Sequence, residues 1–192
     1  MDVRESLLKA AIKLFAEVGS RGATTRRIAQ EAGVNEVTLF RHFKSKDELL
    51  EAALESLVDI VAAKGLPDNP VDPVTELTEW ARDHHKHLHK FRALIRKTLG
   101  EFEEHPDMCA CSMKASIKIS DDLADYLKTL QLRGLAAKGW NTHAAASMLM
   151  GTLFSDALGR DAMPGRFPYS MRDSIDHYLP LFFTAIGVKQ PK

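Results

Sequence analysis

The amino-acid sequence predicts an all-α protein of about nine helices, and two observations favour this fold class. Apolar residues recur three and four positions apart through most of the 192 residues, which is the spacing of one face of an α-helix. No run of residues sustains the alternation of apolar and polar side chains that is typical of a β-strand. The composition, 45% hydrophobic and 27% charged, is that of a folded protein with a sizeable core.

The first four predicted helices are bounded by residues suited to helix ends. They run from about Arg4 to Val18, from the Thr24 cap to Gly33, from Glu36 to about His42, and from Lys46 to Gly65. Thr24 and Asn35 can accept hydrogen bonds from the free N–H groups of a helix N-terminus. Ser45 followed by Glu48 forms a capping box, which places the start of the fourth helix at Lys46. Gly33 suits the left-handed backbone of a tight turn.

Five further helices are predicted after the break Pro67–Pro70. They cover about Pro73–His87, Lys90–Gly100, Pro106–Arg133, Thr142–Ala162 and Ser170–Ile186. We therefore expect two domains, residues 1–50 and residues 51–192.

The N-terminus and the cysteines indicate a cytoplasmic protein. The first residues are acidic where a secretion signal needs a basic start, and no apolar run approaches the roughly 20 residues of a membrane span. Cys109 and Cys111 are two positions apart, a poor spacing for a structural disulfide, so a reducing compartment is expected.

One segment is basic although the whole chain is neutral. Overall, 26 Lys and Arg residues balance 26 Asp and Glu residues. Between Arg21 and Lys46, six Lys and Arg residues stand against two Glu residues, a local net charge of six minus two, or +4. The same segment holds two short helices joined by a glycine turn, which matches a helix-turn-helix whose second helix enters the DNA major groove. A generic helical hairpin would show the same bare pattern.

The detailed string TTRRIAQEAGVNEVTLFRHFKSKDEL, Thr24 to Leu49, resembles the DNA-binding signature of TetR-family regulators. The resemblance continues without a gap over roughly Arg4 to Leu57. It implies an N-terminal three-helix helix-turn-helix domain followed by a helical ligand-binding and dimerisation domain. It also implies a homodimeric repressor that binds a palindromic operator on double-stranded DNA and is released by a small apolar or amphipathic molecule.

The residue types in this string suit contacts to DNA. Thr24 and Thr25 lie at a helix N-terminus, where hydroxyls and free N–H groups can hold a phosphate. Arg26 can bind a guanine edge or a phosphate. On the predicted recognition helix, Glu36 could accept a hydrogen bond from cytosine, although it could also be a solvated first-turn residue that stabilises the helix dipole. Val37 could contact a thymine methyl group.

The remaining predicted DNA contacts rest more on the resemblance. Thr38 and Arg41 are expected to face bases, and Thr38, His42 and Lys46 match positions that contact the DNA backbone. Phe40 stands where the family usually has tyrosine. Phenylalanine keeps the ring but loses the hydroxyl that would bind phosphate, so this one contact is in doubt.

Two further sets of residues follow from the family's general architecture. The predicted dimer interface comprises Met148, Gly151, Phe154, Ser155, Leu158, Tyr178, Leu181 and Phe182. The predicted ligand pocket comprises Trp80, His84, Phe91, Ile95, Met113, Ile117, Trp140 and Met150. Residues of an ordinary intrachain core would show the same apolar character, and the sequence does not separate the two interpretations.

The histidine-rich stretch His84–His89 is the remaining unusual feature. His85 and His89 stand four apart and could bind a metal as neutral imidazoles if His105, Asp107, Cys109 or Cys111 folded over them. The alternative function is therefore a metal-responsive regulator or a metal-binding all-α protein. No convergent catalytic motif is present in the sequence, so we expect neither an enzyme nor a bound cofactor.

Overall fold

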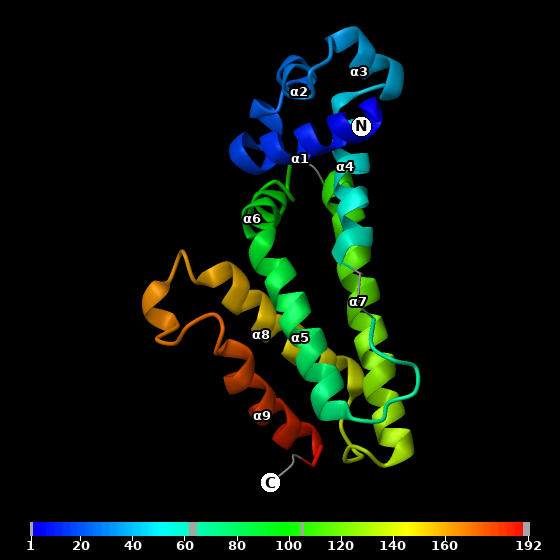
Figure 1. Ribbon diagram of the computed structural model, residues 1–192, viewed down its shortest axis with the longest axis vertical. Helices are drawn as coiled ribbons and strands as arrows, with labels where there is room; N and C mark the ends of the chain where they lie inside the picture. Colours follow the sequence, from blue (N-terminus) through cyan, green and yellow to red (C-terminus); the bar gives the residue numbers. More distant parts are fainter. Residues whose placement is uncertain (1, 62–64, 105, 190–192) are drawn as a thin grey trace. The chain divides into compact units, whose positions relative to one another are not determined.

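The computed structural model describes residues 2–61, 65–104 and 106–189, and this part of the chain contains helices and no strand (Figure 1). The helices are α1 (Val3–Gly22), α2 (Thr25–Glu31), α3 (Glu36–His42), α4 (Lys46–Val61), α5 (Pro73–Lys90), α6 (Arg92–Gly100), α7 (Pro106–Arg133), α8 (Thr142–Gly159) and α9 (Ser174–Ile186), with a short 3₁₀ turn η1 (Pro164–Arg166). The all-α prediction is confirmed. None of the described helices is long and apolar enough to cross a membrane.

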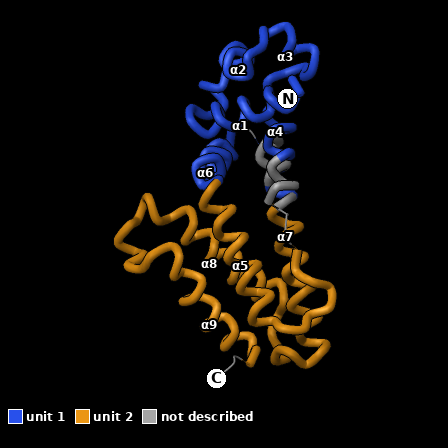
Figure 2. Tube along the Cα trace, in the orientation of Figure 1, with its two compact units in different colours: residues 1–61, 91–115 blue, residues 62–90, 116–192 orange. Residues whose placement is uncertain are grey.

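The chain divides into two compact units, which Figure 2 shows in different colours. Unit 1 contains residues 1–61 and 91–115, and unit 2 contains residues 62–90 and 116–192. Unit 1 thus includes α6 as well as the first four helices. The division expected from the sequence, at residue 50, remains a prediction.

Unit 1 is built around α1, which packs against α2, α4 and α6. Its core consists of buried apolar side chains from α1, α2, α3, α4 and α6, among them Leu7, Phe15, Ile28, Leu39, Leu49 and Leu94. These residues recur at helical spacing on α1 and α4, so the amphipathic faces that the sequence predicts are the faces that pack.

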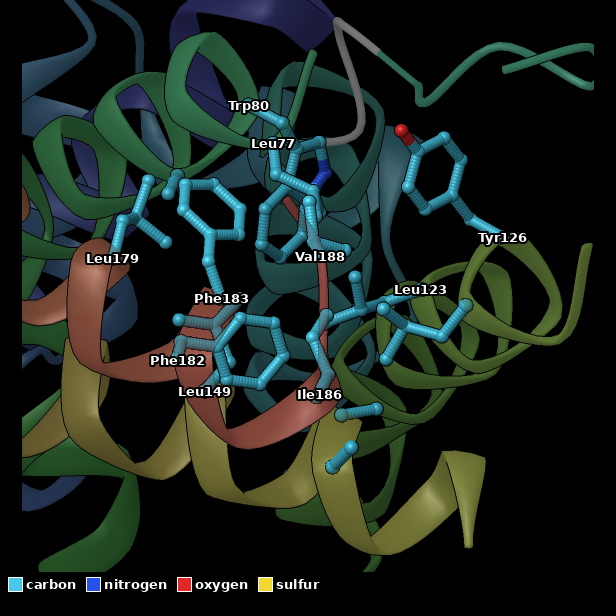
Figure 3. Packing of buried hydrophobic residues seen from close by; sticks show 14 of the residues in the cluster. Leu77, Trp80, Leu123, Tyr126, Leu149, Leu179, Phe182, Phe183, Ile186 and Val188 are labelled. Carbon is cyan, nitrogen blue, oxygen red and sulfur yellow. The ribbon is translucent and has the colours of Figure 1, made fainter. Parts of the chain in front are cut away.

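Unit 2 has a separate core between α5, α7, α8 and α9 (Figure 3). Trp80 and Leu77 of α5 lie in the same cluster as Phe182, Phe183 and further apolar residues of α9. Leu123 of α7 and Leu149 of α8 extend it. The apolar residues of the last long helices therefore form an intrachain core at least in part.

Several helix ends differ from the sequence prediction. Gly19, with φ of 72°, breaks α1, and one more turn follows to Gly22. Helix α5 continues through the histidine stretch to Lys90, although a helix junction was expected there. Helix α8 ends at Gly159, before the expected Ala162, and the guanidinium of the next residue, Arg160, donates to the Tyr169 carbonyl.

Candidate nucleic-acid interface

The α2–α3 pair has the geometry of a helix-turn-helix. The Thr24 hydroxyl caps α2 by accepting from Arg27 N–H at 3.3 Å, and the Asn35 side chain caps α3 by accepting from Thr38 N–H at 2.8 Å. Between the helices, Gly33 has φ of 71°, a left-handed conformation that is sterically unfavourable for residues with a Cβ. The sequence predicted both caps and this turn, and all three are confirmed.

Helix α3 divides cleanly into a packed side and an exposed side. Leu39 is fully buried in the unit 1 core, and Phe43, immediately after the helix, is also buried. Val37 and Phe40 are 64% and 49% exposed, although both are apolar. Arg41 is exposed on the same side of the helix. Exposed apolar side chains beside a cation suit a surface that contacts thymine methyl groups, sugars and phosphates.

The N-terminus of α2 lies against the start of α3 through a direct side-chain contact. The Thr25 hydroxyl donates to Glu36 Oε1 at 2.5 Å. Thr25 and Glu36 were predicted as separate DNA contacts, and the structure brings them together. The contact with Thr25 occupies one acceptor site of the Glu36 carboxylate and leaves its other oxygen for a cytosine amino group.

Cations surround the two helices in different environments. Arg26 and Arg41 are exposed, and neither forms an ion pair with another residue of the described chain. Arg27 donates from Nη1 to the Gly22 carbonyl at 2.9 Å, and Arg21 pairs with Glu104 at 3.0 Å. Arg26 and Arg41 are therefore the cations of this surface best placed to be available for a phosphate or a base.

Lys46 and His42 occupy the positions for which the resemblance predicted backbone contacts. His42 is exposed at the end of α3. Lys46, the first residue of α4, is half-buried, and its ammonium donates to the Ser20 carbonyl at 2.9 Å. An ammonium has three N–H donors, so two remain for a phosphate. Sequence reasoning did not predict the contact with Ser20, because it joins positions 26 residues apart.

The predicted ligand residues are distributed over both units. Trp80, His84, Ile117, Trp140 and Met150 belong to unit 2, whereas Phe91, Ile95 and Met113 belong to unit 1. Trp80 and His84 are buried with their rings stacked, at 5.1 Å between centroids and 9° between planes. Ile117 is exposed. The ligand pocket stays a prediction.

The predicted dimer residues fall on two sides of α8 and α9. Met148, Gly151, Phe154 and Leu181 are exposed. Leu158 and Phe182 are buried within unit 2. Ser155 and Tyr178 are intermediate. The exposed members leave an apolar face on these helices.

The histidine stretch contains two buried residues with different surroundings. Burial, and to a smaller extent the neighbouring His87 and His85, lower the pKa of His84 to about 4, so its ring is neutral at pH 7. His85 Nε2 lies 2.7 Å from Asp156 Oδ1, and burial lowers the pKa of His85 although Asp156 opposes that shift. Within the described residues, no group of three His, Cys, Asp or Glu side chains is placed to hold a metal. His105 and the side chains of Asp107, Cys109 and Cys111 lie outside the described residues.

Asp156 is a buried polar centre that the sequence interpretation missed. Its carboxylate is 0% exposed and accepts hydrogen bonds from Arg160, Tyr178 and Ser174 as well as contacting His85. The signal was available, because Asp156 is the only Asp, Glu, Lys or Arg within the apolar sequence of α8.

The fold and the exposed α3 surface define the class of protein: a helix-turn-helix protein of the DNA-binding type with a second helical unit. Residues 7–53 match the family model described as "Bacterial regulatory proteins, tetR family". The chain is 28% identical over 191 residues to the HTH-type transcriptional regulator YvkB of Bacillus subtilis, whose own function is uncharacterised. That match covers 94% of this chain and 95% of YvkB.

Two further comparisons agree with this match. The tetracycline repressor protein class C of Escherichia coli is 38% identical over 69 residues, which cover 36% of this chain and about a third, 32%, of the repressor. A proposed TetR-family regulator from Mesorhizobium loti shares the fold, with a TM-score of 0.79 at 21% identity over 97% of each chain. The chain is therefore similar to DNA-binding transcriptional regulators of the TetR family, through the family model in its N-terminal segment and through sequence and fold over nearly its whole length.

Proposed function

We propose that this chain is a TetR-type repressor that binds a palindromic operator as a homodimer and is released by a small apolar or amphipathic ligand. The observation that carries the proposal is the exposed side of α3, where Val37, Phe40 and Arg41 face outward from a helix whose other side is buried. A monomeric protein gains nothing from exposing these apolar residues, whereas a helix in the major groove would cover them.

The proposed DNA contacts divide into positioning and specificity. Thr24, Thr25, His42 and Lys46 would hold phosphates on either side of the groove. Arg26, Val37, Thr38 and Arg41 would contact base edges. Glu36, held by Thr25, would contribute to base selection through its second carboxylate oxygen. Phe40 would contact sugar or a thymine methyl group, without the phosphate bond of a tyrosine.

Two copies of the chain would be needed for stable binding. A single helix-turn-helix module buries only about 600–1,000 Å², so proteins of this kind place two recognition helices about 34–36 Å apart. The exposed residues Met148, Gly151, Phe154 and Leu181 offer an apolar face on α8 and α9 for a second copy. Small side chains such as Gly151 would allow close approach of the helices.

The repressor and ligand-release steps of the proposal rest on the family and on the separate helical unit. The named relative from Escherichia coli is a repressor, and it matches this chain over 69 residues. Trp80 and the neutral His84 of unit 2 could offer a ligand an aromatic face and one hydrogen-bonding nitrogen. Ligand binding would release DNA if the ligand preferred the form with the lower DNA affinity.

Selection of bound fragments from genomic DNA at physiological salt tests the proposal directly. We expect a palindrome with half-sites about one helical turn apart, bound by two chains as measured by analytical ultracentrifugation. A triple change of Val37, Phe40 and Arg41 to alanine should abolish selection while the helical content stays the same. The proposal fails if the folded wild-type protein selects no sequence.

A further inference from the structure

A chain of three groups in unit 1 connects the end of α6 to the start of α4 through the backbone of one residue, Ser20. Glu101, the residue that follows α6, accepts from the Ser20 N–H through Oε1 at 2.8 Å. The carbonyl of the same residue, Ser20, accepts from the Lys46 ammonium at 2.9 Å. A carboxylate and an ammonium therefore hold the backbone of one residue from both sides, Glu101 at the N–H and Lys46 at the carbonyl, and both are charge-assisted hydrogen bonds.

The backbone at this point is built to receive both charged groups. Gly19 has φ of 72° and breaks α1, and Ser20 is only 2% exposed. Thr24 N–H, which would complete the helical pattern at the Ser20 carbonyl, donates to Gly22 instead. The Ser20 carbonyl therefore lies outside the α1 ladder, where Lys46 can reach it.

Glu101 fits into the space that glycine leaves at position 19. A Cβ added to Gly19 would lie 2.5 Å from Glu101 Oε1, which is too close for two unbonded atoms. The other carboxylate oxygen, Oε2, is buried and has no hydrogen-bond partner within the described residues. Among the described residues, Ser20 N–H is consequently the hydrogen-bond donor that fixes the carboxylate.

We propose that Glu101 is a positioning residue for DNA binding, acting through the backbone of Ser20 to hold the Lys46 ammonium where it binds a phosphate. This inference rests on the proposed DNA-binding function, in which Lys46 is a backbone contact. A free lysine must lose the freedom of four rotatable bonds to bind a phosphate, whereas the Ser20 carbonyl already restrains this one. Glu101 itself is 81 residues from Ser20 in sequence and makes no DNA contact in the proposal.

Glu101→Ala is the first test, with Glu104→Ala as the matched control. Both changes remove one negative charge from the segment after α6, but the Glu104 carboxylate pairs with the exposed Arg21. Removing a carboxylate near a DNA-binding surface should leave affinity unchanged or raise it. Glu101→Ala should instead weaken binding to the selected palindrome by about tenfold. Of the two substitutions, only Glu101→Ala is thus expected to lower the affinity for DNA.

The role of Lys46 is tested in a double-variant cycle. Lys46→Ala should weaken binding and lower the salt slope by about one unit per chain. Adding Glu101→Ala to that variant should change the affinity by less than about twofold, because the group that Glu101 positions is gone. Glu101→Gln, which keeps an oxygen for Ser20 N–H, should retain most of the wild-type affinity.

Amide hydrogen exchange supplies a readout without DNA. Exchange at Ser20 N–H should accelerate in Glu101→Ala but not in Glu104→Ala. If Glu101→Ala does not fold, Glu101→Asp takes its place, since it keeps the charge but withdraws the carboxylate by one methylene.

The results separate the two proposals. A folded Glu101→Ala or Glu101→Asp variant that binds like the wild type overturns the positioning role, as does an equal loss with and without Lys46. A wild-type protein that binds no duplex overturns the proposed function, and the positioning role falls with it. The expected pattern, a loss confined to proteins that contain Lys46, supports both.

Discussion

Replacement of Asp156 should lower the free energy of unfolding strongly. Its carboxylate is fully buried and joins α5, α8 and α9. Arg160 donates to both of its oxygens at 2.8 Å, Tyr178 donates at 2.6 Å and Ser174 at 3.1 Å, and His85 Nε2 lies at 2.7 Å. Burial by itself would raise the pKa of Asp156, but the hydrogen bonds from Arg160, Tyr178 and His85 hold it at about 2.

Asp156→Ala would remove the acceptor from all of these donors at once. It would leave the Arg160 guanidinium, whose side chain is 14% exposed, without its carboxylate. Breaking a buried ion pair by removing one partner costs about 3–5 kcal/mol, because the other charge stays buried. The tyrosine and serine hydroxyls lose partners too, so the upper part of this range is expected. In a chain of this length the loss corresponds to a fall in Tm of roughly 6–20 °C.

Tryptophan fluorescence during urea unfolding measures this effect in the relevant unit. The chain has two tryptophans, and Trp80 and Trp140 both belong to unit 2. Asp176→Ala is the matched control, because it removes the same charge from an exposed ion pair with Arg82 and should cost less than about 1 kcal/mol. If Asp156→Ala lost no more free energy of unfolding than Asp176→Ala, the reasoning about the buried carboxylate would be refuted.

Three further predictions concern other parts of the molecule. Lys46→Ala should weaken binding to all DNA sequences alike and reduce the slope of log affinity against log salt by about one per chain. A fluorescence titration measures this slope, and an unchanged slope would contradict the assignment of Lys46 to a phosphate. The free energy of unfolding should fall by up to about 3 kcal/mol as the pH drops from 6.5 towards 4. The pKa of His84 in the folded protein is about 4, below its usual value, so the unfolded chain binds the proton first. His84→Phe, which keeps the ring against Trp80, should flatten that pH dependence in urea titrations; a slope as steep as the wild type's would contradict the assignment. Leu181→Glu, at a side chain that is 72% exposed on α9, should yield a folded monomer by light scattering, whereas a persisting dimer would place the interface elsewhere.

The helix-turn-helix segment could be predicted almost completely from the sequence. Its caps at Thr24, Asn35 and Ser45 and its turn at Gly33 depend on residues two to four positions away, and the structure has hydrogen bonds at all three caps. Local hydrogen bonding of this kind is encoded by neighbouring residues, so it can be inferred without knowing the tertiary fold.

The environment of individual site residues could not be predicted in the same way. The sequence suggested Glu36 and Lys46 as DNA contacts, and the structure gives each an intramolecular partner, Thr25 and the Ser20 carbonyl. Leu158 and Phe182 were grouped with exposed residues of α8 and α9, yet both are buried. The side of a helix that packs against another helix depends on the position of that second helix.

By itself, the sequence determined the all-α class, the starts of α2, α3 and α4 and the resemblance to a family, because helical periodicity, capping and the signature string are properties of short segments. Only the tertiary structure decided that Glu101 meets Ser20 and that His85 meets Asp156, 71 positions away. Such pairs form when packing of the apolar faces brings remote segments together, and the burial that results makes a charged partner necessary.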